Sequence, residues 1–241
     1  MTRVALLCLA LTCPAGAVEL PSGQVYVLGE VHDNPAHHAA QGALIEQIAP
    51  TAVVFEMLDP EQAARLGPDR PRDPQALDAL LGWSEAGWPD IAIYMPVFDA
   101  IGVPVLGAAG EAGDLSAYGL DMPLPETEQA TREALQADAH CGVLPAELLP
   151  QFVARQRAVD ARLAARTLDA LDRFGAPVVL IAGNGHARAD WGVPAAIARV
   201  RPGIEVVAVV QGEEGSVPPG GDVVLDAPAP ADRPDPCDAF R

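Results

Sequence analysis

Two segments of the sequence place a histidine three residues after a glycine at the end of an apolar run. The first, VYVLGEVHD, contains Gly29 and His32, and the second, VVLIAGNGHARAD, contains Gly183 and His186. Histidine titrates near neutral pH, and its neutral nitrogen binds metals, so such residues can move protons or hold an ion. A single Gly-x-x-His is typical of a hydrogen-bonded loop, whereas two copies after equivalent strands indicate a shared site.

Carboxylates accompany both histidines. Glu56 follows the apolar run Val53-Val54-Phe55, and an ionised carboxylate there is costly to bury without a cation, a metal or hydrogen bonds. Two imidazoles with one or two carboxylates are a suitable ligand set for a divalent metal ion. We therefore predict His32, Glu56 and His186 as metal ligands, with Glu30 as general base if the site hydrolyses a substrate.

Five short apolar runs rich in valine are expected to be strands buried on both faces. They lie at residues 25–29, 52–58, 103–108, 177–183 and 204–210. Between them, helical spacing predicts a helix from Asn34 to Pro50, a long helix from 146 to about 174, and a helix at 193–200. This order predicts an α/β fold with a mainly parallel central sheet, helices on both faces and a small helical insertion.

In an open parallel sheet, ligands bind beyond the carboxyl ends of the strands. Both Gly-x-x-His segments lie at such ends, so His32 and His186 should share one crevice if their strands are adjacent. Gly29 and Gly183 are expected to turn the chain there with a positive φ. His37 and His38, on the first helix, are expected to form a partly exposed face.

Composition narrows the classes of function. The chain has 241 residues, of which 50% are apolar, and this favours one domain with a sizeable core. A net charge of -18 argues against binding to nucleic acid or to an anionic membrane. The sequence contains no Gly-x-Ser-x-Gly, P-loop, dinucleotide-binding or Cys-x-x-Cys motif. This argues against nucleotide binding and against covalent attachment of haem.

The two ends of the chain predict export and a disulfide. Residues 1–17 combine Arg3, an apolar stretch and Ala15-Gly16-Ala17, which predicts a secretory signal peptide and a periplasmic protein. The alternative is a lipoprotein anchored to a membrane through Cys13. We expect Cys141 and Cys237 to pair, tying an acidic tail rich in Pro and Gly, residues 212–241, onto a domain at 18–211.

Several segments, in order, resemble the ChaN-type haem-binding, iron-regulated proteins of the Tiki/TraB-like superfamily. They are YVLGEVHDNPAHH, FEML, GWSEAGWPDIAIYMPVFDA, HCGVLP and GNGHARADWGVP. The resemblance covers nearly all of the chain after the signal segment. It implies an exported bacterial protein linked to haem or iron uptake, and it places Glu30, His32, Glu56 and His186 on positions that the superfamily shares.

A haem binder needs an apolar slot, an axial ligand and partners for the propionates. We predict Tyr94 or His140 as axial ligand and Arg188 as propionate partner, with a homodimer completing a shallow site. The aromatic residues Trp83, Trp88, Tyr94 and Phe98 would form either the wall of this slot or the core of a small subdomain.

Two further hypotheses stand beside haem binding. One is a Tiki-like metal-dependent hydrolase that uses the two histidines and Glu56. The other is a scaffold without catalysis, in which the histidines brace the sheet.

Overall fold

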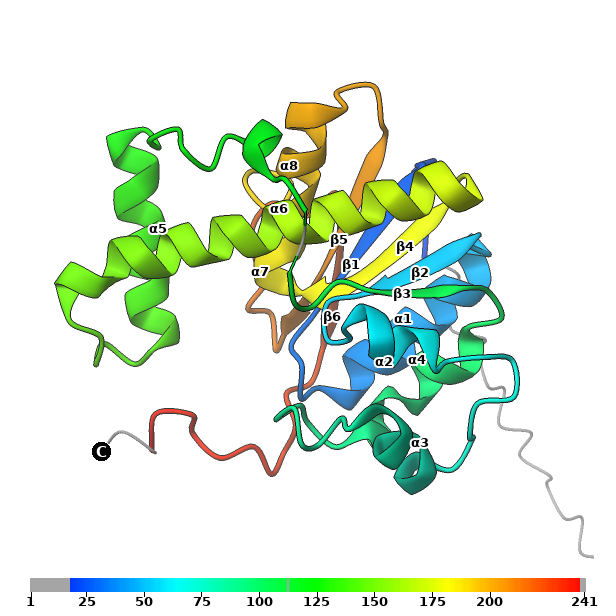
Figure 1. The fold of residues 1–241 in the computed structure, drawn as a ribbon. Coiled ribbons are helices and arrows are strands. Elements are labelled where there is room, and N and C mark those ends of the chain that lie inside the picture. The colour runs from blue at the N-terminus through cyan, green and yellow to red at the C-terminus, as the bar shows by residue number, and fades with distance from the viewer. Residues whose placement is uncertain (1–17, 112, 239–241) are drawn as a thin grey trace, which may run out of the picture.

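Parallel strands form the centre of the protein in the computed structural model, which describes residues 18–111 and 113–238 (Figure 1). The strands are β1 (Val25–Glu30), β2 (Ala52–Phe55), β3 (Val105–Gly107), β4 (Val178–Gly183), β5 (Val206–Glu213) and β6 (Val223–Ala227). They form one sheet in the order β3-β2-β4-β1-β5-β6, and every neighbouring pair is parallel. The predicted α/β fold with a mainly parallel sheet is confirmed.

Helices cover both faces of this sheet. On one face, α1 (Pro35–Ile48) packs with α4 (Met95–Ala100), and on the other α6 (Leu149–Phe174) packs with α8 (Val193–Val200) (Figure 1). Alternate strand residues therefore enter two separate cores, with Val53 in the first and Val54 in the second. All residues of β1 and β4 are buried, which explains the apolar runs at 25–28 and 178–182, and Glu30 at the end of β1 is the charged exception.

The helical insertion lies between β2 and β3. It contains α2 (Pro60–Ala64), α3 (Pro74–Leu81), the 3-10 helix η1 (Ile91–Tyr94) and α4. Asp59 and Asp73 cap α2 and α3, and a proline follows each cap, as expected for a first helical turn. Trp83, Tyr94 and Phe98 are buried here, so these aromatic residues form core rather than the wall of a slot.

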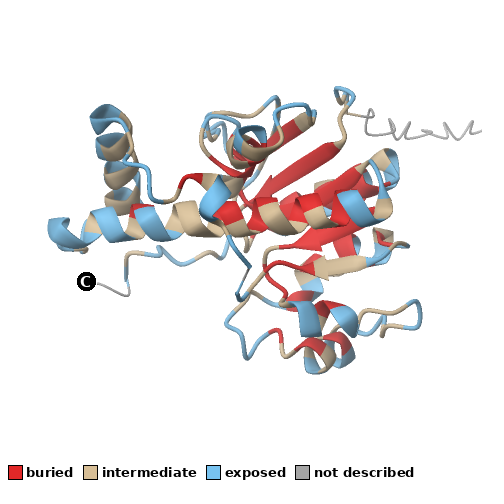
Figure 2. Ribbon diagram, turned by 45° about the horizontal axis from the view of Figure 1, so that its top comes forward, coloured by how far each residue is buried: buried red, intermediate tan, exposed pale blue. Residues whose placement is uncertain are grey.

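The chain segment that connects β3 to β4 forms a helical arm that extends beyond the sheet (Figure 1). We use this name for α5 (Glu126–Ala139) and residues 140–156, which include the 3-10 helix η3 (Ala146–Leu148) and the first turns of α6. A further 3-10 helix, η2 (Ser116–Tyr118), precedes the arm. Figure 2 shows that the arm is mostly exposed or half-buried, whereas the central strands β1, β2 and β4 are buried. α5 contains no buried residue.

The prediction for the face of α1 was wrong. His37 and His38 are fully buried, with Gln41, Gly42, Leu44 and Ile45 on the same face. The buried position of these polar side chains is explained by hydrogen bonds, because His37 and His38 reach backbone carbonyls of Gly212 and His32.

Part of the predicted tail at 212–241 belongs to the sheet. Residues 212 and 213 complete β5, and β6 adds an edge strand beside it. Cys141 and Cys237 form a disulfide, as predicted, which ties the segment after β6 to the helical arm. Arg233 also pairs with Asp33 and Glu213, so this segment is fixed at two points.

The predicted signal peptide at 1–17 and the lipidation alternative at Cys13 lie outside the described residues. Within the described residues, no helix combines the length and the apolar character needed to cross a membrane.

Candidate functional site

The strand order brings the two Gly-x-x-His segments and Glu56 together. β4 lies between β1 and β2, so the residues that follow these three strands meet at one edge of the sheet. His186 lies on α7 (Asn184–Ala187), directly after β4. A Cβ on Gly183 would lie 3.1 Å from His32 Nε2 and 3.8 Å from Glu56 Oε2. The two histidines and Glu56 thus gather around Gly183.

The glycines serve this convergence by a different means from the one predicted. Neither Gly29 nor Gly183 has a positive φ, and Gly29 lies within β1. At Gly29, a Cβ would stand 2.5 Å from Asn184 Oδ1 and 3.0 Å from the Cβ of Ala187. Glycine is needed here for close packing of β1 against α7, not for a sharp turn.

Glu30 is a buried anion that holds its neighbours in place. Its Oε1 lies 2.7 Å from His32 Nδ1 and accepts a hydrogen bond of 2.6 Å from the Tyr94 hydroxyl. Its Oε2 accepts a hydrogen bond of 2.8 Å from Gln41 Nε2 and lies 3.5 Å from His38 Nδ1. Burial raises the pKa of Glu30, but the hydrogen bonds from His32 and His38 outweigh this and hold it well below the usual range. Both carboxylate oxygens of Glu30 therefore have buried polar partners.

His32 is the exposed end of this network. Burial lowers the pKa of His32. The hydrogen bond to Glu30 and the negative charge of Glu30 together outweigh burial and raise this pKa above its ordinary value. Its ring also contacts Trp88 edge to face, with centroids 5.2 Å apart. The side chain of His32 is 33% exposed.

His186 lies between two carboxylates. Its Nδ1 is 2.6 Å from Asp160 Oδ1, and its Nε2 is 3.4 Å from Glu56 Oε1. Burial lowers the pKa of His186, yet the hydrogen bonds to Asp160 and Glu56 raise it to about 10 overall. The other Glu56 oxygen accepts a hydrogen bond of 2.8 Å from the Gly183 amide. At neutral pH His186 is therefore an imidazolium in a buried ion-paired cluster.

The predicted metal ligands do not form a preformed metal site. Among the residues that the structure describes, no group of three His, Cys, Asp or Glu side chains is arranged to hold a metal ion. In this arrangement His32 Nδ1 is paired with Glu30, and the two ring nitrogens of His186 face Asp160 and Glu56.

The three predicted haem contacts lie in three different places. Tyr94 is fully buried, and its hydroxyl donates to Glu30 and to the backbone oxygen of His32. Burial and the Glu30 charge raise the Tyr94 pKa, so this phenol is held as a neutral donor inside the core. It is not placed to reach a ligand at the surface.

Arg188 faces a neighbouring pocket. Its Nε and Nη2 donate to the two carboxylate oxygens of Asp190, at 2.9 and 2.6 Å, and its guanidinium lies 3.6 Å from the centre of the Trp191 ring. It does not line the surface around His32 and His186.

His140 lies beside the two motif histidines, in a hollow of about 630 Å³ that we call the histidine hollow. Its lining includes His32, His140 and His186, the apolar side chains Phe152 and Val159, and the exposed cation Arg155. His140 Nδ1 is 2.8 Å from the backbone oxygen of Gln136, and its ring packs edge to face on Phe152. The arm therefore supplies one wall of the hollow and the sheet edge supplies the other.

Sequence reasoning missed Asp160 and Gln41, which orient the site from the two covering helices. A signal for Asp160 was present, because it occupies an apolar stripe of α6 with Val153, Leu163 and Leu171, all buried. A charged residue on such a stripe indicates a buried partner. The spacing of apolar residues in α1 predicted a buried face without Gln41, whereas Gln41 is fully buried.

The family described as "Haem-binding uptake, Tiki superfamily, ChaN" matches residues 17–197. The solved structure described as "Cofacial heme binding to ChaN of Campylobacter jejuni" is 23% identical, with 84% of this chain and 86% of that chain covered and a TM-score of 0.62.

A second solved structure, of the type III effector HopBA1, is 12% identical, with 86% of this chain and 88% of that chain covered and a TM-score of 0.49. No curated protein matches this sequence.

Proposed function

Because this chain belongs to the ChaN family of haem-binding uptake proteins in the Tiki superfamily, we propose that it binds haem noncovalently in the histidine hollow and acts in haem uptake. The observation that carries the proposal is the convergence of three of the five histidines in one hollow of suitable size. Its volume of about 630 Å³ falls in the range of known small-molecule sites.

The place of His140 in the hollow favours it as the axial ligand. Its ring packs on the apolar side chain of Phe152, and Arg155 lines the same hollow. His140 Nδ1 lies at hydrogen-bonding distance from the backbone oxygen of Gln136, and donation from this nitrogen would leave Nε2 free for iron. This is the usual arrangement of a metal-binding histidine.

Side chains of α6 suit the rest of the porphyrin. Phe152 and Val159 supply apolar surface, and Arg155 can pair with a propionate. Arg155 replaces Arg188 in this role, because Arg188 is bound to Asp190 outside the hollow.

The proposal extends to dimerisation over the bound haem and to export of the protein. The related protein is described as binding haem cofacially, and an open hollow leaves one face of a bound haem uncovered. We propose that a second copy of the chain covers that face. Residues 1–17 support export to the periplasm, with lipid attachment at Cys13 as the alternative route.

Titration of the purified protein with haemin tests the proposal. We expect a saturable shift of the Soret band at micromolar protein, and His140→Ala should weaken binding by roughly tenfold or more. His32→Ala should leave the axial ligation spectrum intact, and Arg72→Ala, an exposed arginine paired with Asp99 on the insertion, is the neutral control.

Two outcomes would contradict parts of this scheme. A spectrum that stays that of free haemin throughout the titration rules out the binding role. Loss of the bound spectrum in His32→Ala but not in His140→Ala would assign the axial ligand to His32 instead.

A further inference from the structure

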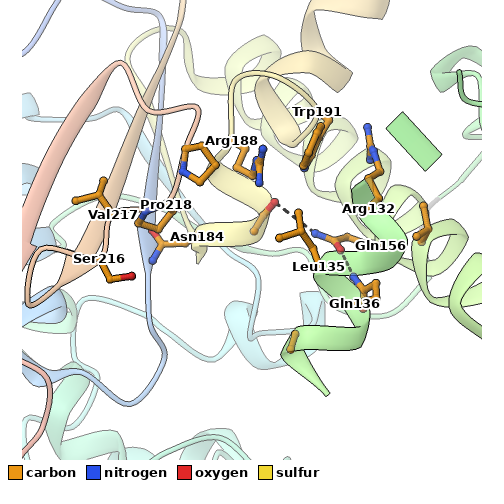
Figure 3. Close-up of a pocket in the computed structure, with 14 residues that line it drawn as sticks. Arg132, Leu135, Gln136, Gln156, Asn184, Arg188, Trp191, Ser216, Val217 and Pro218 are labelled. Carbon is orange, nitrogen blue, oxygen red and sulfur yellow. Dashed lines mark hydrogen bonds between the residues drawn. The ribbon is translucent and has the colours of Figure 1, made fainter. Parts of the chain in front are cut away.

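A second cavity, of about 450 Å³, lies between the helical arm and the loop that connects β5 to β6 (Figure 3). We call it the tryptophan pocket. The lining residues that matter here are Arg132, Leu135, Arg188, Trp191, Val217 and Pro218. Figure 3 shows Trp191 with Arg188 on one side and Arg132 on the other.

The charge of this pocket is opposite to that of the chain. The sequence has 33 acidic and 15 basic side chains, yet the charged residues that line the pocket are both arginines. Their guanidinium carbons lie 3.6 Å (Arg188) and 4.8 Å (Arg132) from the centre of the Trp191 ring. Such stacking fixes each cation in place through cation–π attraction.

Donor capacity remains on both arginines after their own ion pairs are counted. Arg188 uses Nε and Nη2 for Asp190, and Arg132 uses Nη2 for Glu128. Arg132 Nε is buried and has no hydrogen-bond partner in the described chain. The Nη1 atoms of both arginines take no part in these ion pairs, and they are the donors that an incoming anion would use.

The pocket lining also contains apolar side chains. Leu135 on α5 is 43% exposed and Val217 is 39% exposed, and Val153 and two prolines extend the same surface. Leu135 and Val217 come from segments far apart in the sequence, so the exposed surface exists only because the fold brings them together. A concave apolar surface beside fixed donors is the usual form of a small-molecule site.

We propose that the tryptophan pocket binds a small amphiphilic anion, with one acidic group between Arg132 and Arg188 and an aromatic or branched apolar body against Leu135 and Val217. The two arginines recognise the carboxylate or sulfonate, and the exposed apolar side chains recognise the body. This site goes beyond the proposed haem function and does not depend on it.

The tryptophan pocket and the histidine hollow are neighbours with a common wall. Gln136, Ala139 and Gln156 line both. The side chains of Gln136 and Gln156 are hydrogen-bonded to each other across the arm, which closes the wall between the two spaces. Haemin is itself an amphiphilic anion, so the test must separate the two sites.

The test uses 8-anilinonaphthalene-1-sulfonate, a fluorescent probe with one sulfonate on an aromatic body, and the full chain without haemin. We expect saturable binding of about one probe per chain. Leu135→Asp and Val217→Asp should each weaken it by roughly tenfold. The matched control is Val224→Asp, because Val224 is an apolar residue of β6 that is 50% exposed and does not line the pocket.

The charge requirement has its own pair of variants. Arg132→Gln should weaken probe binding and reduce its salt dependence, whereas Arg72→Gln, an exposed arginine, should change neither. His140→Ala should leave probe binding unchanged, since His140 does not line this pocket.

Three results would overturn the proposal. They are no saturable binding at roughly 1 mM probe, an equal loss of binding in Val224→Asp, and displacement of the probe by haemin combined with loss of the Soret shift in Leu135→Asp. The last result would make this pocket the haem site. Failure of haemin binding with normal probe binding would instead contradict only the haem proposal.

Discussion

Buried carboxylates hold His32 and His186 in fixed orientations. Glu30 binds His32, and Asp160 binds His186, each through the histidine Nδ1. Each pair removes two polar groups from water and compensates for that loss with a short charge-assisted hydrogen bond. His32 and His186 are therefore each oriented by a buried carboxylate, whereas His140, at the end of α5, is oriented by a backbone carbonyl.

The His186 cluster predicts a specific dependence of stability on pH. The folded-state pKa of His186, about 10, exceeds the unfolded value of about 6.5. The cluster therefore contributes its full stability below about pH 6.5 and loses it as the pH rises toward about 10. The free energy of unfolding of the wild type should exceed that of His186→Gln by about 3–5 kcal/mol at pH 6, and this difference should shrink by about pH 9.

Denaturant unfolding at several pH values measures this difference. His140→Gln is the matched control, because it removes an imidazole whose Nδ1 bonds a backbone carbonyl instead of a carboxylate. A wild-type advantage over His186→Gln that stays constant across the pH range would contradict the charged state of His186.

At the scale of elements, the site depends on how closely β1 approaches α7. Asn184 Oδ1 accepts a hydrogen bond from the Gln211 amide, and Asn184 Nδ2 donates to the Gln211 carbonyl. The first residue of α7 is thus tied to β5 across the end of β1. The lack of a side chain on Gly29 is what makes room for this connection.

Gly29→Ala should lower the free energy of unfolding by about 1–3 kcal/mol. The added Cβ would stand 2.5 Å from Asn184 Oδ1, and Asn184 cannot withdraw without losing its bonds to Gln211. Gly67→Ala is the control, since a Cβ there meets nothing within 4 Å and its φ is not positive. Equal stability of the two variants in denaturant unfolding would show that Gly29 is not packed as described.

At the scale of the whole molecule, the disulfide links the helical arm to the C-terminal segment. Cys141 and Cys237 are 96 residues apart in the sequence, so the bond removes much of the freedom of the unfolded chain. It also lies next to His140, the proposed axial ligand, and thereby fixes the outer wall of the histidine hollow.

Replacing both cysteines, Cys141→Ser with Cys237→Ser, should lower the free energy of unfolding by about 2–4 kcal/mol. The measurement is denaturant unfolding of the double variant and the wild type, each with and without reductant. Reductant should destabilise only the wild type. A wild type that is indifferent to both reductant and mutation would contradict the pairing.

Much of the fold follows from local sequence pattern. Valine-rich runs bounded by Gly or Pro located five strands, and the caps Asn34 and Gly175 mark the bounds of α1 and α6. β6 was missed, because it is a short edge strand with alternating exposure in a segment rich in Gly and Pro. Its pairing with β5 is a long-range contact that no local pattern records.

The sequence by itself determined that two Gly-x-x-His segments and Glu56 end parallel strands, because strand ends are a local property of apolar runs. Only the tertiary structure decided what those residues contact. The strand order places β4 between β1 and β2. The covering helices bring Asp160 to His186, and they bring Gln41 and His38 to Glu30. Burial and partners set whether a histidine is a cation or a ligand, and both depend on packing between segments distant in sequence.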